Sequence, residues 1–182
     1  MKCSVYIATS TDGFIARPDG DIDWLLRPEY REASDVGLIY EEFIATVDAV
    51  VMGRHTFEKV STFDEWYYED QEVYVLTSRE LVIPEHLKER VQVLSGTPSE
   101  IVGRLKGEGK RHLYIDGGIT IQRFLEAGLI DELTITVIPI LLGSGIPLFG
   151  NGGGREQPLE LMAIESSRTG PVQLRYRVRQ HV

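Results

Sequence analysis

Cysteine is almost absent from this chain, since Cys3 is the only one among 182 residues. A lone cysteine cannot form an intramolecular disulfide, so we expect a reducing compartment and a cytoplasmic protein. Cys3 lies in the apolar stretch KCSVYIA, which favours a small core residue over a nucleophile. Long apolar runs are missing as well. No segment approaches the roughly 20 apolar residues of a membrane-spanning helix, and the N-terminal run is too short for a secretory signal, so we expect no membrane partner.

Basic residues are also in short supply, with 19 Lys and Arg against 28 Asp and Glu and a net charge of -9. A chain this acidic repels phosphate polymers, which argues against nucleic acid as a partner. A small anion can still bind where a few basic side chains cluster, because such a cluster acts over about 8–10 Å. The four histidines lie far apart, without an H-E-x-x-H motif or a cysteine partner, and this predicts no metal site.

Common catalytic and nucleotide-binding motifs fail at single positions. In LLGSGIP, Leu142 stands where the G-x-S-x-G nucleophile elbow needs a glycine. Arg104 replaces the first glycine of a P-loop, and Leu148 replaces the third glycine of a G-x-G-x-x-G fingerprint. These departures exclude the usual forms of those sites and leave open a nucleotide that is bound in another way.

The length and the 42% hydrophobic content suit a single domain, residues 1–182, with a substantial core. Short continuous apolar runs predict strands buried on both faces of a mostly parallel sheet; they are CSVYIA, DAVVMG, EVYVLT, VQVL, HLYID and ELTITVIPIL. Between them, a helical period runs from Val36 to Val47 after Ser34 as a candidate N-cap. TPSEIVGRLKGEG opens with a capping box from Thr97 to Glu100, and GGITIQRFLEAG begins and ends with glycine.

The C-terminal stretch PLELMAIESSRTGPVQLRYRVRQ contains two strand-like runs joined by the turn SRTGP. In its second run, residues 172–178, apolar and polar side chains alternate, which predicts one apolar face and one solvent-facing face that includes Gln173. The expected fold class is therefore α/β: a central, mostly parallel sheet with a C-terminal antiparallel hairpin and helices on both faces.

Anion-friendly residues follow three of the predicted strands. Open parallel sheets bind ligands beyond the carboxyl ends of their strands, so these residues should meet at one edge. Each set alone could be only a turn, but together they suit a ligand with phosphates at two positions, such as a 2′-phosphorylated dinucleotide. The sets are Gly53, Arg54, His55 and Thr56; Thr77, Ser78 and Arg79; and Asp116, Gly117, Gly118, Ile119 and Thr120.

The segment VVMGRHTFE resembles the M-G-R-x-T-[WF]-E segment of dihydrofolate reductases. Together with SVYIATSTDGFIA, VLTSRE, YIDGG and DELTITVIPILLGSGIPLF, it resembles the dihydrofolate-reductase-like superfamily. The nearest likeness is to the reductase domain of the bifunctional riboflavin-biosynthesis deaminase/reductase. The similarity runs from about residue 2 to the final hairpin, whereas the deaminase motifs H-x-E and P-C-x-x-C do not occur.

This resemblance implies NADPH in an extended pose across the strand ends, bound more tightly than NADH. It also implies a cis peptide between Gly117 and Gly118. The implied contacts are backbone groups of Ala8 and Ile15 at the nicotinamide carboxamide; Gly53, Arg54, His55 and Thr56 at the pyrophosphate, joined by Ser78 and Arg79 at the 2′-phosphate; and Gly117, Gly118, Ile119 and Thr120 at the nicotinamide and diphosphate.

Asp116 is the candidate catalytic residue. Riboflavin-pathway reductases have a glutamate before the paired glycines, and a carboxylate beside the nicotinamide can relay a proton or hold a substrate hydroxyl. The alternative is a helix-capping carboxylate. Dihydrofolate reductases have a carboxylate in the helix before M-G-R; its place here is near Gly37, with Asp35 out of register, and this disfavours pteridine reduction.

The candidate substrate-binding residues are Asp12, Asp23 and Trp24. GDIDWLL resembles the segment that covers the substrate in riboflavin-pathway enzymes, which suggests Asp23 and Trp24 for that wall. Asp12 could equally form a turn, and Trp24 could simply pack a loop. The same packing role is expected for Tyr67 and Tyr68 in the acidic, aromatic stretch FDEWYYEDQE.

The leading hypothesis is an NADPH-dependent reductase of a small heterocyclic substrate, 5-amino-6-(5-phosphoribosylamino)uracil by resemblance. Dihydrofolate reduction and a non-catalytic NADPH-binding protein are the alternatives. Homodimers are usual in the riboflavin branch, and we expect one here.

Overall fold

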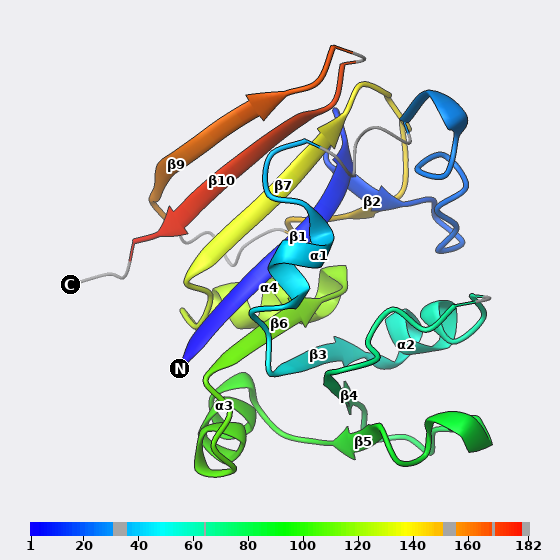
Figure 1. Cartoon of the computed structure of the whole chain (residues 1–182), viewed down its shortest axis with the longest axis vertical. Helices are drawn as coiled ribbons and strands as arrows, with labels where there is room; N and C mark the ends of the chain where they lie inside the picture. The colour runs from blue at the N-terminus through cyan, green and yellow to red at the C-terminus, as the bar shows by residue number, and fades with distance from the viewer. Residues whose placement is uncertain (31–35, 64, 151–155, 169, 180–182) are drawn as a thin grey trace.

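A computed structural model describes residues 1–30, 36–63, 65–150, 156–168 and 170–179 (Figure 1). The strands are β1 (Lys2–Ser10), β2 (Phe14–Ala16), β3 (Ala49–Gly53), β4 (Glu72–Leu76), β5 (Val91–Leu94), β6 (His112–Asp116), β7 (Glu132–Ile138), β8 (Ile146–Pro147), β9 (Leu159–Ser166) and β10 (Val172–Val178). The helices are α1 (Tyr40–Ile44), α2 (Arg54–Val60), the 3₁₀ helix η2 (Glu85–Leu87), α3 (Pro98–Gly107) and α4 (Gly118–Glu126).

Eight strands form one sheet in the order β5-β4-β3-β6-β1-β7-β10-β9. The pairs from β5 to β7 are parallel, and β10 pairs antiparallel with both β7 and β9. A small second sheet pairs β2 with β8. The parallel sheet and the C-terminal edge hairpin confirm the expected fold class (Figure 1).

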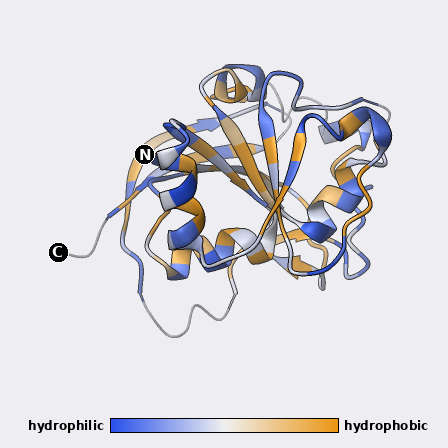
Figure 2. Cartoon of the chain, turned by 90° about the horizontal axis from the view of Figure 1, so that it is seen from below, coloured by the Kyte–Doolittle hydropathy of each residue, from blue (hydrophilic) through white to orange (hydrophobic). Residues whose placement is uncertain are grey.

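Helices cover both faces of the sheet, and alternate residues of each central strand contribute to two separate cores. Val51 and Ile115 pack with α3 and α4, whereas Met52 and Tyr114 pack with α1 and α2. The apolar strands lie between helices on the two sides in Figure 2. Cys3 belongs to the first core, and burial raises its pKa to about 12, so the predicted inert core cysteine is confirmed.

Two of the predicted helices have the expected ends. Pro98 begins α3, and the capping box is complete: the Thr97 hydroxyl accepts from the Glu100 N–H, and the Glu100 carboxylate accepts from the Thr97 N–H. The helix of GGITIQRFLEAG is α4.

The helix expected between Val36 and Val47 is wrong in extent, because only Tyr40–Ile44 is helical. Gln173 explains the difference: its side-chain amide accepts from the Leu38 N–H and donates to the Leu38 carbonyl, which holds this segment out of a helix. Gln173 is consequently buried, so its expected solvent-facing position is also wrong. Ser34, the expected N-cap, lies outside the described residues.

Candidate active site

Two helices begin side by side at the carboxyl edge of the sheet. β3 and β6 are parallel neighbours, and Met52 of β3 pairs with Asp116 of β6. Helix α2 follows β3 directly with Gly53 as its N-cap, and α4 follows β6 with Gly117 as its N-cap. Neither N-cap has a side chain that could bond to the first turn, so no capping side chain competes with a ligand for the leading N–H groups of the two helices.

Each of these helices packs a threonine against the first glycine of the other. A Cβ atom at Gly117 would lie 2.2 Å from the Thr56 hydroxyl oxygen, and one at Gly53 would lie 3.1 Å from that of Thr120. Gly117 also has a φ of +86°, which L side chains rarely adopt. The expected cis peptide between Gly117 and Gly118 is wrong, since the described residues contain no cis bond; the positive φ of Gly117 turns the chain into α4 instead.

The Gly117→Ala variant should lose about 2–4 kcal/mol of unfolding free energy, because the new methyl group meets both the positive φ and the Thr56 hydroxyl. Chemical denaturation measures the loss. Adding Thr56→Ala should restore part of it by removing the clash, while Gly53→Ala should cost less than Gly117→Ala. Equal losses for the two glycine variants would contradict this interlocked arrangement.

Among the predicted phosphate-binding cations, Arg54 and His55 both contact Glu58. The Arg54 guanidinium lies 2.6 Å from one Glu58 carboxylate oxygen, and His55 Nδ1 lies 3.3 Å from the other. Arg79 differs, because its exposed side chain has no acidic partner within the described residues. The turn before it is fixed by a hydrogen bond from the Arg79 N–H to the Thr77 hydroxyl. Ser78 lies exposed in the same turn, so the VLTSRE segment presents an unneutralised cation.

Asp116 ends β6 with a carboxyl group that is partly buried. One carboxyl oxygen accepts the Gly117 N–H at 2.8 Å, and the other accepts the Tyr68 hydroxyl at 3.3 Å. Burial raises the pKa of Asp116, while the hydrogen bonds from Gly117 and Tyr68 oppose the rise. Sequence reasoning missed Tyr68, since nothing in FDEWYYEDQE distinguishes it from its neighbour Tyr67.

The proposed nicotinamide contacts fall on two elements. Ile15 of β2 lies against the start of α4, since its Cδ1 atom is 3.0 Å from the position that a Cβ atom would take at Gly118. Ala8 lies near the carboxyl end of β1 and packs toward Trp24. At the start of α4, the Ile119 side chain is exposed while Thr120 is buried. The structure thus brings Ile15 and the paired glycines together.

Asp12 anchors a loop. Its carboxylate accepts hydrogen bonds from the Ser10 hydroxyl and from the backbone N–H groups of Leu142 and Gly143. The bond from Ser10 is the main reason that the pKa of Asp12 lies below its usual range. Both oxygens are engaged in joining the β1–β2 turn to the segment after β7, which fits the turn-forming alternative; a substrate contact remains a prediction.

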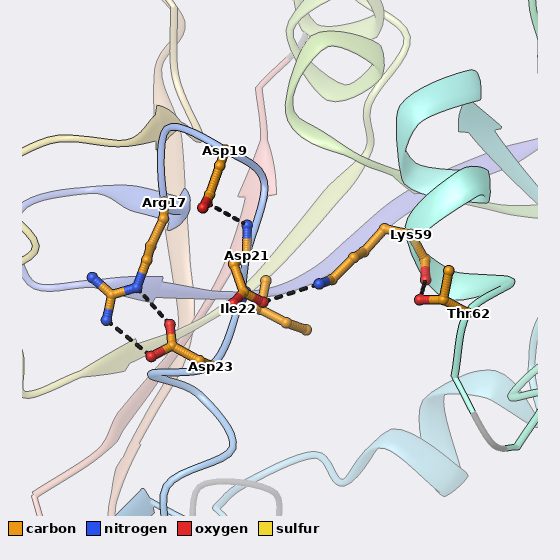
Figure 3. A network of polar contacts seen from close by, with 7 residues as sticks. All are labelled: Arg17, Asp19, Asp21, Ile22, Asp23, Lys59 and Thr62. Carbon is orange, nitrogen blue, oxygen red and sulfur yellow. Dashed lines mark hydrogen bonds and ion pairs between the residues drawn. The ribbon is translucent and has the colours of Figure 1, made fainter.

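The segment after β2 is held by two ion pairs, which Figure 3 shows from close by. Arg17 donates to both carboxylate oxygens of Asp23, at 2.5 and 3.1 Å. Lys59 of α2 donates to Asp21 at 2.9 Å, which ties this segment to the helix that begins at the site. The pKa of Asp23 lies below its usual range because of the bond from Arg17. Asp23 is therefore committed to an ion pair within its own loop.

Trp24 is fully buried and packs against Ile138, Ala8 and Leu142. Its indole N–H is the only buried side-chain polar atom without a hydrogen-bond partner in the part of the chain that the structure describes. The burial agrees with the loop-packing alternative, so a role for Trp24 in substrate binding stays a prediction.

The family described as RibD C-terminal domain matches residues 2–173. The chain belongs to this family. The uncharacterized protein YwjB of Bacillus subtilis (strain 168) is 40% identical over 150 residues, which cover 81% of this chain and 82% of that relative. The family assignment confirms the resemblance that the sequence motifs carry.

One solved structure agrees with the RibD C-terminal domain assignment, and a second agrees with the fold. A protein from Shewanella sp. PV-4, provisionally named as a riboflavin biosynthesis protein, is 37% identical with a TM-score of 0.87, over 98% of this chain and 99% of its own. Dihydrofolate reductase from Enterococcus faecalis, complexed with NADP(H), has a TM-score of 0.58 at 16% identity, over 97% and 96% of the two chains. The second likeness concerns the fold, which is dihydrofolate-reductase-like.

No helix in the described residues has the length and apolar character that crossing a membrane requires. Within the same residues, the His, Cys, Asp and Glu side chains form no group of three or more that could hold a metal ion.

Proposed function

We propose that this protein is an NADPH-dependent reductase whose substrate is 5-amino-6-(5-phosphoribosylamino)uracil or a closely related heterocycle. Membership of the RibD C-terminal domain family supports a pyrimidine-reductase-like oxidoreductase. The observation that supports the proposal most is the adjacency of two helix starts without side-chain caps, beside Asp116 at the end of β6. Phosphates suit the helix starts, and a proton donor suits the carboxyl group beside them.

The residues of this edge fit a dinucleotide. The glycines at the two N-caps bring no side chain of their own to the helix starts, and the tight Thr56–Gly117 packing fixes the distance between the two helices. In the proposal, Gly53 to Thr56 and Gly117 to Thr120 hold the diphosphate. Thr77, Ser78 and Arg79 hold the adenosine 2′-phosphate, because the Arg79 guanidinium has no acidic partner within the described residues.

The chemistry divides between cofactor and chain. NADPH supplies a hydride when bound. Asp116 supplies the proton that reduction of a carbon–oxygen or carbon–nitrogen double bond also consumes, and burial of its carboxyl group favours the protonated form that can donate. Backbone groups of Ala8 and Ile15 orient the nicotinamide, and Asp12, Asp23 and Trp24 are proposed for the substrate side.

Absorbance of NADPH, followed with the phosphoribosylaminouracil and separately with dihydrofolate, tests this function. We expect consumption with the pyrimidine substrate. Consumption with dihydrofolate alone would favour dihydrofolate reduction. The helix carboxylate of that enzyme has no counterpart in register here, since its place is near Gly37 and Asp35, which lies outside the described residues, is displaced from it in the sequence. Tight NADPH binding with neither substrate reduced would favour a binding protein without turnover.

The proposal includes a homodimer formed through β9, the edge strand of the sheet. Leu161 and Ile164 are 53% and 62% exposed, and they pair across the hairpin with Tyr176 and Leu174, which extends the apolar face. Exposed apolar patches of this kind mark interaction surfaces, and a second copy offers a self-complementary partner.

Replacing both Leu161 and Ile164 by lysine should convert the dimer to a monomer, because two lysines from each protomer would bury like charges across the symmetric interface. Light scattering coupled to size-exclusion chromatography measures the mass. Val82→Lys is the matched control, since Val82 is 86% exposed and lies outside β9. A wild-type monomer, or a dimer that survives both lysines, would contradict this interface.

A further inference from the structure

Tyr68 lies in the segment between α2 and β4, and its ring is fixed from two sides. The side chain is buried, within the core that also contains Phe57. The Trp66 indole N–H donates to the Tyr68 carbonyl at 3.1 Å, and the two rings meet edge to face with centroids 5.2 Å apart. Trp66 makes a second edge contact with Phe57 of α2. The phenol is therefore held rigidly, with its hydroxyl group toward the end of β6.

The hydroxyl group of Tyr68 completes the hydrogen bonding of Asp116. Since the Gly117 N–H occupies one carboxyl oxygen, the Tyr68 hydroxyl fixes the other and with it the rotation of the carboxyl group. The distance of 3.3 Å is long for such a bond, as is common at catalytic groups before a ligand binds.

Among the described residues, Tyr68 is the one tyrosine whose hydroxyl group donates to the Asp116 carboxyl. Tyr114 of β6 faces the carboxyl group too, but its hydroxyl donates to the Tyr6 carbonyl at 2.8 Å. Tyr40 of α1 lies near enough for the Asp116 charge to raise its pKa, after burial as the larger cause. In the described part of the chain, Asp116 has no ion-pair partner, so its surroundings are tyrosines and a backbone amide.

We infer that Tyr68 is a positioning residue for the reduction: its hydroxyl group holds the Asp116 carboxyl in the orientation from which a proton passes to the substrate. The inference rests on the proposed function and extends it to a residue outside the cofactor-binding segments. When the substrate double bond accepts a hydride, the Asp116 O–H bond breaks and its proton moves to the substrate heteroatom. Solvent then returns a proton to the carboxylate, which restores the group for the next turnover.

The direction of the expected effect follows from the hydrogen bond. Donation from Tyr68 stabilises the ionised carboxyl and so opposes the rise in the pKa of Asp116 that burial causes. Tyr68→Phe removes this donor while keeping the ring. The pKa of Asp116 should then rise further, and the pH at which kcat falls on the alkaline side should move upward by about one unit. The loss of orientation should lower kcat about tenfold with little change in NADPH affinity.

The test compares wild type, Tyr68→Phe and the control Tyr67→Phe, whose hydroxyl group belongs to an exposed neighbouring ring. The pH profile of kcat is measured for each, and the Asp116 carboxyl is titrated by ¹³C NMR with Asp116→Asn to assign its signal. We expect both the kcat profile and the carboxyl titration to move upward in Tyr68→Phe alone. A kcat that falls without movement of either curve would mean a packing role and would overturn the inference.

The NMR titration keeps the two proposals separable, because it needs no turnover. A wild-type protein that reduces neither substrate would overturn the proposed function. An Asp116 titration that is the same in Tyr68→Phe and in wild type would overturn the inference about Tyr68, even in an active enzyme.

Discussion

Asp116→Asn should lower kcat by a factor of about 10²–10⁴ and still make the folded protein more stable at neutral pH. Asparagine keeps the shape of the side chain and an oxygen that can accept the Gly117 N–H, but it has no proton to donate to a substrate. Activity and stability therefore change in opposite directions, which a general loss of folding cannot produce.

The pH dependence follows from the sign of the shift. Burial raises the pKa of Asp116 in the folded protein above its unfolded value. The stability that this difference contributes is fully present below the unfolded pKa, and it is lost as pH rises through the folded pKa. At neutral pH, which lies above the unfolded pKa, folding must either protonate this carboxyl group or bury it ionised, and both cost free energy that the asparagine variant does not incur. We expect the variant to melt a few degrees higher at pH 7 and to lose this advantage in acid.

Asp48→Asn is the matched control at the opposite end of the sheet. Its carboxylate accepts the N–H groups of Arg111 and His112, and these bonds hold the pKa of Asp48 below its usual range. This variant should melt lower at neutral pH, with turnover unchanged. Asp116→Asn with wild-type kcat, or with a lower melting temperature at pH 7, would contradict the role that we assign to the carboxyl group.

Arg79→Ala should weaken NADPH binding about tenfold and leave NADH binding almost unchanged. In the proposed pose Arg79 meets the 2′-phosphate, which NADH lacks, and a hydrogen bond between charged groups contributes about 1.5–3 kcal/mol before solvent screening reduces it. Its guanidinium group has no acidic partner within the described residues, so its charge is not already neutralised. Calorimetric titration of the variant with both cofactors measures the two affinities.

Glu58 provides the contrast for this prediction. It pairs with both Arg54 and His55, so a cofactor phosphate must compete with a carboxylate already in place. Glu58→Gln should therefore bind both NADPH and NADH more tightly, since the diphosphate is common to the two. If Arg79→Ala lowered the affinities for NADPH and NADH equally, or lowered neither, the assignment of Arg79 to the 2′-phosphate would be wrong.

Much of the scaffold could be predicted because its signals are local. The capping box at Thr97 predicted the start of α3 correctly, since such a cap forms between residues three positions apart. The glycines around α4 likewise predicted that helix. The continuous apolar runs predicted parallel strands because both faces of such strands are buried. The order of these strands places the Arg54 and Asp116 segments beside each other, as the strand-end argument expected.

Two of the misses concern contacts between distant parts of the chain. Gln173 holds Leu38 across 135 positions, and no local period could show that the pair would shorten the first helix. Tyr68 donates to Asp116 across 48 positions, so no local pattern could distinguish this tyrosine from its neighbour Tyr67. Glu58 is a different case, because it lies four residues after Arg54 on the same helix, where the local spacing alone allows an ion pair.

A crystal structure of the protein with NADPH bound would test the central claim most directly. We expect the diphosphate against the first turns of α2 and α4, the 2′-phosphate on Arg79, and the nicotinamide beside Asp116. A cofactor bound elsewhere, or a nicotinamide ring that lies away from this carboxyl group, would contradict the account.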